Sequence, residues 1–184
     1  LFPLLFEYRG LGPLDFWNGL AVTLVILIAL AARLDPGLRR AGGGTLAGRP
    51  ATAVLVGLGS AAALYVIFLV GNIMVRRIVD VAGAEIDSVY AFKADASRLR
   101  IGILMLMVIG PGEEILWRAH LQRRLAERCG AWRGFALATG CYTAVHLATG
   151  NLVLIAAALT CGLFWGWLWL KFRSPLTNMV SHTA

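Results

Sequence analysis

The stretch IGILMLMVIGPGEEILWR, residues 101–118, decides the fold, because it places two adjacent carboxylates at the end of an apolar run. Its first twelve residues carry no charge, and Glu113 and Glu114 follow at once. Ionisable groups in membrane helices usually face a protein interior or a water-filled cavity, and they often mark function. On a helix, Glu114 and Arg118 are i,i+4 neighbours in the order that favours an ion pair. Glu113 points about 100° away around the helix and stays available for chemistry.

The composition of the 184-residue chain is that of a membrane protein. Hydrophobic residues make up 59% of the sequence and charged residues only 15%, and the mean hydropathy is +0.74. A soluble domain of this length does not need so much apolar sequence. We therefore expect an all-α, polytopic transmembrane helix bundle that forms a single membrane domain over residues 1–184.

Apolar runs of about 20 residues, the length that crosses a bilayer as a helix, predict five or six spans. The expected helices cover residues 14–32, 51–75, 99–120, 133–149, 151–170 and the start of a helix at 174–184. The neutral residues 149–151 offer a turn between the fourth and fifth helices, and Ser174-Pro175 is a favourable start for the last. We expect the third helix to continue past Arg118, and we expect the native chain to continue past Ala184 because the last helix is too short to span.

Residues 76–98, between the second and third spans, are too polar to remain in the bilayer core. Their apolar residues recur at roughly helical spacing: Ile78, Val81, Ala82, Ile86 and Val89. This spacing predicts an amphipathic helix that lies on the membrane surface.

The net charge of +7 could indicate binding to nucleic acid, but the basic residues form short clusters between apolar spans. Those clusters are Arg33, Arg39, Arg40 and Arg49, then Arg123, Arg124, Arg128 and Arg133, then Lys171 and Arg173. This pattern is typical of loops that face the cytoplasm and anionic lipid. We therefore expect the lipid bilayer and no nucleic acid as a partner, with the N-terminus outside.

Other residue types predict structural roles. Cys129, Cys141 and Cys161 have no CxxC or CxxH spacing, so neither a disulfide framework nor a zinc finger is expected. His120 is interpreted as a surface residue near the interface. An interfacial aromatic belt is the interpretation of three residues that alternate near the end of the fifth span, Trp165, Trp167 and Trp169.

Two histidines lie in apolar segments and can join the free carboxylate. Tyr142 precedes His146 by one helical turn, and Asn178 precedes His182 in the same way. Glu113 and the two histidines come from three predicted helices, as a site inside a bundle requires. A buried carboxylate can act as a general base, a histidine can orient water, and a second donor can stabilise an oxyanion. The set therefore predicts hydrolysis.

Two other chemistries compete with this prediction. A serine-based triad is not expected, because Ser181 adjoins His182 and side chains one residue apart on a helix do not face each other. Glutamate with two histidines is also a known zinc ligand set, so a zinc-dependent membrane protease stays open as an alternative. The chain has no HExxH motif, and we expect no metal and no cofactor.

Three motifs in this order resemble one known family. They are Glu113-Glu114-x-x-x-Arg118, Tyr142-x-x-x-His146 and a last motif that opens with His182. Together they resemble the CAAX protease and bacteriocin-processing family of intramembrane glutamic endopeptidases, over roughly residues 50–184. That family usually has Phe where this chain has Tyr142, and it usually has Asn or Asp four residues after the last His, a position beyond Ala184.

The resemblance implies a role for each matching residue. Glu113 would activate the attacking water, His146 would help to hold that water, and His182 would contribute to the oxyanion hole. Support for the site would come from Glu114, Arg118 and Tyr142. The family's substrates include prenylated C-termini and bacteriocin-type peptides, so the implied partner is a membrane-associated peptide or lipidated protein.

The resemblance also implies a location, the cell membrane of a prokaryote, with the site towards the cytoplasmic side. Two further readings stay open beside the endopeptidase. One is a non-catalytic membrane immunity or interaction protein on the same scaffold. The other is a transporter that relays protons, although no internal repeat is visible to support it.

Overall fold

The computed structural model describes residues 2–8, 10–38, 46, 48–78, 83, 85–86 and 97–184. Within this part of the chain, sheet structure is limited to a small antiparallel hairpin of β1 (Gly10–Leu11) and β2 (Leu14–Asp15). The remaining elements are the helices α1 (Phe2–Tyr8), α2 (Phe16–Leu34), α3 (Pro50–Ile78), α8 (Ala131–Ala144), α9 (Leu152–Phe172) and α10 (Pro175–Thr183), the short turn η4 (Leu147–Thr149), and a long central helix over residues 98–129.

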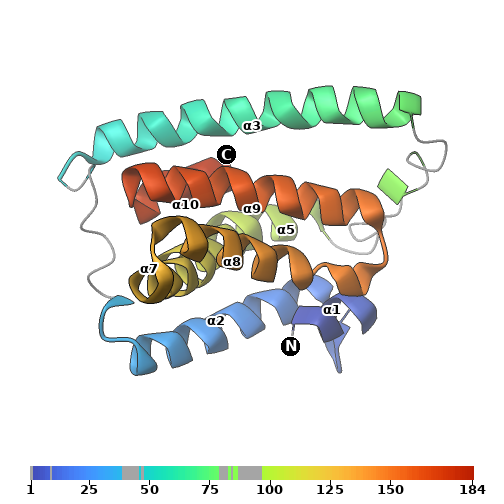
Figure 1. The fold of residues 1–184 in the computed structure, drawn as a ribbon. Helices are drawn as coiled ribbons and strands as arrows, with labels where there is room; N and C mark the ends of the chain where they lie inside the picture. The colour runs from blue at the N-terminus through green and yellow to red at the C-terminus, as the bar shows by residue number, and fades with distance from the viewer. Residues whose placement is uncertain are drawn as a thin grey trace.

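The helices pack as a bundle in which α3 covers one side and α2 the opposite side, with α9 and α10 beneath α3 (Figure 1). Among the described residues, three helices are long and apolar enough to cross a membrane: α2, residues 50–77 of α3, and α9. The chain is therefore an all-α membrane protein, as the sequence predicts. The number of five or six spans stays a prediction.

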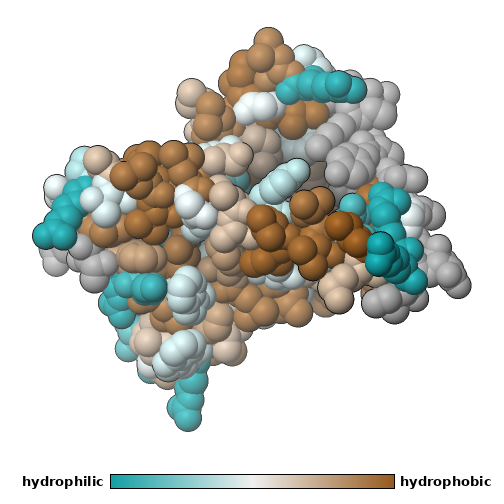
Figure 2. Space-filling model, turned by 90° about the horizontal axis from the view of Figure 1, so that it is seen from above, coloured by the Kyte–Doolittle hydropathy of each residue, from teal (hydrophilic) through white to brown (hydrophobic). Residues whose placement is uncertain are grey.

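The outer surface of α3 has the composition of a face in contact with lipid. Seen from the α3 side, apolar residues cover much of the molecule and hydrophilic residues lie mainly at its margins (Figure 2). A helix that is apolar all round is either buried or membrane-embedded. The exposed apolar residues of α3 include Leu55, Leu58, Tyr65, Phe68, Leu69, Ile73 and Met74.

The central helix is continuous, but two of its segments have π-helical instead of α-helical winding. Its segments are α5 (Arg98–Leu104), the π-helical η2 (Met105–Ile109), α6 (Gly110–Glu113), the π-helical η3 (Glu114–Gln122) and α7 (Arg123–Cys129). Pro111 has no N–H to donate to the carbonyl four residues before it, and the Gly110 N–H donates to Met105, five residues before it. The helix continues past Arg118, as expected, and the π-helical turns lie beside the glutamate pair, a frequent location for them at functional sites.

Close packing brings α10 against α3 and the central helix. A Cβ atom at Gly57 would lie 2.7 Å from the Cβ of Val180, and one at Gly110 would lie 2.4 Å from Cγ2 of Thr183. Only glycine allows backbones to approach so closely. The expected start of α10 is confirmed, because the Ser174 side chain accepts a hydrogen bond from the Thr177 N–H.

Ion pairs join α2 to the central helix at both ends. Near their starts, Arg100 Nη1 lies 2.7 Å from the Asp15 carboxylate. Near the end of α2, Asp35 accepts hydrogen bonds from His120 Nδ1 at 2.8 Å and from Arg123. Twenty residues separate the two aspartates, and twenty separate Arg100 from His120. The two helices therefore run in parallel, with ties about 30 Å apart, close to the thickness of a bilayer core.

The tie at Asp35 corrects the interpretation of His120 as a surface residue. Asp35 is only 2% exposed, and the half-buried ring of His120 donates to it from the central helix. Burial raises the pKa of Asp35, but the hydrogen bonds from His120 and Arg123 and the positive charge of Arg123 lower it more. Its pKa is therefore below the usual range of an aspartate.

Most of the predicted surface helix at residues 76–98 lies outside the described residues, as do Arg39 and Arg40 in the first basic cluster. The observed boundaries of α2, α3 and α9 differ from the predicted ones by one to three residues. The larger differences are that the central helix continues to Cys129, nine residues past the predicted end, and that α8 ends at Ala144, five residues before the expected end at Thr149.

Replacing Asp35 with Asn is expected to destabilise the fold by about 2 kcal/mol, because hydrogen bonds to a charged group contribute about 1.5–3 kcal/mol each. Thermal unfolding in detergent, followed by tryptophan fluorescence, measures this loss. Asp15→Asn is the matched control, because Asn still caps α2 and the Asp15–Arg100 pair is largely exposed, so its loss costs at most about 1 kcal/mol. Equal losses in the two variants would contradict a special role for the buried tie.

The same tie predicts a pH dependence of stability. A carboxylate whose pKa is lowered on folding stabilises the fold above its unfolded pKa, near 3.8 for Asp35, and that contribution is lost as the pH falls through the folded value. The difference in unfolding temperature between wild type and Asp35→Asn is therefore expected to shrink below about pH 4. Unfolding scans across an acid pH series test this, and a difference that grows on acidification would refute it.

Candidate active site

The carboxylate of Glu114 is fully buried and held by three side chains. Its Oε1 accepts a hydrogen bond from His182 Nδ1 at 2.8 Å, and its Oε2 accepts one from Asn178 Nδ2 at 3.0 Å. Arg118 Nη1 lies 3.4 Å from Oε1, so the predicted ion pair is present. Both oxygens of Glu114 are engaged, which suits this residue for bracing the central helix against α10.

Arg118 lies between two aromatic rings as well as beside Glu114. Its guanidinium carbon is 4.7 Å from the centre of the Tyr142 ring and 5.6 Å from that of Trp165. A cation over an aromatic face is attracted by the ring's electrons. The charge of Arg118 therefore connects the central helix to both α8 and α9.

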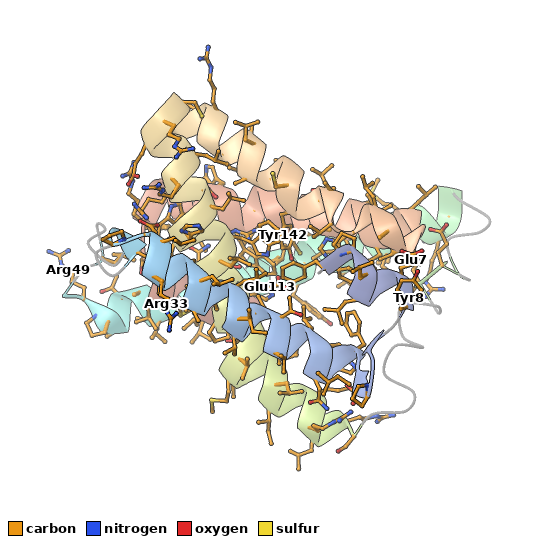
Figure 3. All side chains as sticks on the ribbon, turned by 90° about the horizontal axis from the view of Figure 1, so that it is seen from below. Glu7, Tyr8, Arg33, Arg49, Glu113 and Tyr142 are labelled. Atoms are coloured by element: carbon orange, nitrogen blue, oxygen red, sulfur yellow. The ribbon has the colours of Figure 1, made fainter. Side chains whose placement is uncertain are left out.

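Glu113 points away from this cluster and has fewer partners. Tyr142 Oη donates a hydrogen bond to Glu113 Oε2 at 3.2 Å, and His182 Nε2 lies 4.0 Å from the same oxygen. The two labelled side chains of Glu113 and Tyr142 meet in the interior of the molecule, between Arg33 near one end and Tyr8 near the other (Figure 3). Glu113 can therefore accept further hydrogen bonds, whereas both oxygens of Glu114 are already engaged.

The imidazole of His182 is fixed in orientation between the two glutamates. Trp165 stacks on it with ring centres 3.8 Å apart and an angle of 15° between the planes. Because a carboxylate only accepts, Nδ1 donates to Glu114, and Nε2 is turned towards Glu113. At that position Nε2 can accept a hydrogen bond from water or, when protonated, donate one to an oxyanion.

The position of Trp165 corrects the prediction of an interfacial belt. Trp165 is 5% exposed and Trp169 is buried too, whereas Trp167 is exposed. The indole N–H of Trp165 donates to Ser181 Oγ at 3.2 Å. Trp165 is thus part of the site, and Ser181 is engaged with it.

His146 lies beside the site instead of within the predicted helix. Because α8 ends at Ala144, the residue falls in the turn that follows, where its Nδ1 donates to the Tyr142 carbonyl at 2.9 Å. Among the described residues, His146 forms no hydrogen bond or ion pair with Glu113 or His182. It is connected to Glu113 through Tyr142, which bonds both.

The structure therefore brings all six expected residues together, with His146 joined to the other five through Tyr142. No role in the site was expected for Asn178, Trp165 or Phe6, whose ring centre lies 4.8 Å from that of His146. Asn178 had a usable signal, because it lies four residues before His182 and so shares its helical face. Nothing local indicated that Phe6 would reach His146, since that contact depends on tertiary packing alone.

The described residues contain no group of three or more His, Cys, Asp or Glu side chains arranged to hold a metal ion. Their cysteines, Cys129, Cys141 and Cys161, are all free thiols. The zinc alternative is left to experiment.

Comparison with known proteins gives one match. The sequence model described as "Type II CAAX prenyl endopeptidase Rce1-like" matches residues 95–184, which include the central helix, α8, α9 and α10. The matched family is a family of proteases, which are hydrolases. Residues 95–184 are thus similar to the Rce1-like type II CAAX prenyl endopeptidases. Searches of curated proteins and of solved structures each found no match.

Asn178→Leu is expected to lower stability by about 3 kcal/mol, because it leaves Glu114 Oε2 and the Trp165 carbonyl without the donor that serves both. Asn72→Leu makes the same change at an exposed position of α3 and is expected to cost less than about 0.5 kcal/mol. Thermal unfolding of the two variants in detergent measures the contrast. Similar unfolding temperatures for both would show that Asn178 does not brace Glu114.

Proposed function

We propose that the protein is a membrane-embedded endopeptidase in which Glu113 activates the attacking water. The observation that carries this proposal is the difference between the two adjacent carboxylates. Glu114 has both oxygens engaged by His182 and Asn178, whereas among the described residues Glu113 accepts one hydrogen bond, from Tyr142, and faces an imidazole nitrogen. Different surroundings give adjacent carboxylates different roles, and Glu113 is the one free to take a proton.

The proposed reaction follows from this arrangement. Glu113 takes a proton from water, and the resulting hydroxide adds to the carbonyl carbon of the scissile peptide. His182 Nε2–H stabilises the oxyanion, as donors aimed at developing charge do, and His146 helps to hold the water. The carbon–nitrogen bond then breaks, and the proton passes from Glu113 to the leaving amine. Tyr142 holds the Glu113 carboxylate in place throughout.

We also propose that the central helix spans the membrane beside α2. The support is the pair of ties at its two ends, which lie as far apart as the surfaces of a bilayer core. The Asp35 tie adjoins the predicted cytoplasmic clusters that begin at Arg33 and Arg123, so this end would face the cytoplasm. The substrate would be a membrane-associated peptide, prenylated or of the bacteriocin type, reached from that side of the cell membrane of a prokaryote.

Glu113→Gln is expected to lower cleavage at least about 100-fold, because general-base catalysis contributes about 10²–10⁴-fold. The assay follows cleavage of prenylated and unprenylated membrane-peptide reporters by the purified protein in detergent. Glu127→Gln is the matched control, because Glu127 is 51% exposed on α7 and lies outside the site. Equal unfolding temperatures for the variants show that the comparison concerns chemistry and not folding.

Other outcomes of this assay would favour one of the alternative functions. Undiminished cleavage by Glu113→Gln would overturn the proposed mechanism. Loss of cleavage on adding a chelator, with recovery on adding zinc, would favour the metal-dependent protease. A folded wild-type protein that cleaves no reporter would favour the non-catalytic scaffold.

A further inference from the structure

The ring of His146 packs against two aromatic side chains. Its centre lies 5.2 Å from that of Tyr142, with the planes at 55°, and 4.8 Å from that of Phe6, with the planes at 43°. Phe6 comes from α1, at the opposite end of the sequence from α10. It lies outside residues 95–184, which the family model matches.

The helix α1 is anchored to the site by buried residues. Leu5 is completely buried and Phe2 nearly so. The Phe2 ring lies 5.7 Å from that of Trp117, whose ring meets Tyr142 edge-on at 5.4 Å. A chain of ring contacts thus runs from α1 through the central helix to the tyrosine that bonds Glu113. Phe6 is held at a fixed place relative to the proposed base.

The ring of His146 is restrained by few polar contacts. His146 lies after the end of α8, and among the described residues its ring makes one hydrogen bond, from Nδ1 to the Tyr142 carbonyl, which fixes the tautomer and leaves Nε2 as the acceptor. One hydrogen bond sets one point of the ring but not the ring plane. A second aromatic ring packed against the imidazole, that of Phe6, restricts rotation about the side-chain torsion that turns the ring plane.

We propose that Phe6 is a positioning residue that holds the His146 ring so that Nε2 faces the water activated by Glu113. This inference rests on the proposed function. A catalytic group must be held close to its productive geometry, and a misplacement of about 1 Å can cost about 100-fold in rate. The other residues of the site all lie within residues 95–184, which the family model matches. The N-terminal helix adds Phe6 to them.

The kinetic test compares Phe6→Ala, Phe6→Tyr and Tyr8→Ala in the reporter assay. Phe6→Ala is expected to lower kcat by about 10- to 100-fold with little change in KM, because the loss concerns the reacting water and not substrate binding. Phe6→Tyr keeps the ring and is expected to restore most of the activity. Tyr8, 70% exposed on the same helix, is the control, and Tyr8→Ala is expected to leave kcat unchanged.

A second measurement reports on the contact without needing activity. In protein labelled at histidine Cε1, the Hε1 resonance of His146, identified by its loss in His146→Gln, is expected to shift in Phe6→Ala but not in Tyr8→Ala. An unchanged resonance in Phe6→Ala, an unchanged kcat, or a higher KM at unchanged kcat would each overturn the positioning role. If Glu113→Gln is inactive while Phe6→Ala has normal kcat, only this inference fails; full activity in Glu113→Gln removes the proposed function itself.

Discussion

The buried carboxylate of Glu114 is the constraint on which the rest of the site depends. A charge removed from water is tolerated only where other groups take over its hydrogen bonds and balance its sign. Here Asn178, His182 and Arg118 do so from α10 and from the central helix itself. These hydrogen bonds hold α10 against the central helix. They also occupy Nδ1 of His182, so that Nε2 is the nitrogen turned towards Glu113. The adjacent Glu113 is turned by the helix towards α8.

The backbone is adapted to this arrangement on both sides of the glutamate pair. Pro111 disturbs the helical bonding just before it, and the π-helical η3 starts with Glu114 itself. Gly110 lets Thr183 approach to a distance that any side chain would prevent. The π-helical winding and the close packing at Gly110 together place His182 beside both Glu113 and Glu114, which are neighbours in sequence. The aromatic rings of Trp165 and Tyr142 then pack against the charge of Arg118.

Features that depend on local sequence could be predicted. The all-α membrane class, the Glu114–Arg118 pair and the start of α10 at Ser174 follow from hydropathy, i,i+4 geometry and capping. Features that depend on tertiary packing could not. Trp165 resembled an interfacial residue because sequence does not show which side of an apolar helix meets other helices. The early end of α8 at Ala144 could not be predicted either, because the residues that follow it are apolar enough to continue the helix.

The parallel ties between α2 and the central helix have a mechanical consequence. Two helices tied near both ends resist sliding along one another, so if both span the membrane, as proposed, they would respond to a thicker or thinner bilayer as a single unit. Such a unit adapts to hydrophobic mismatch by tilting. Its internal distances do not change when it tilts. The carboxyl of Glu113, the proposed base, would therefore keep its geometry in membranes of different lipid composition, while its depth below the surface varies with the tilt angle of the two helices.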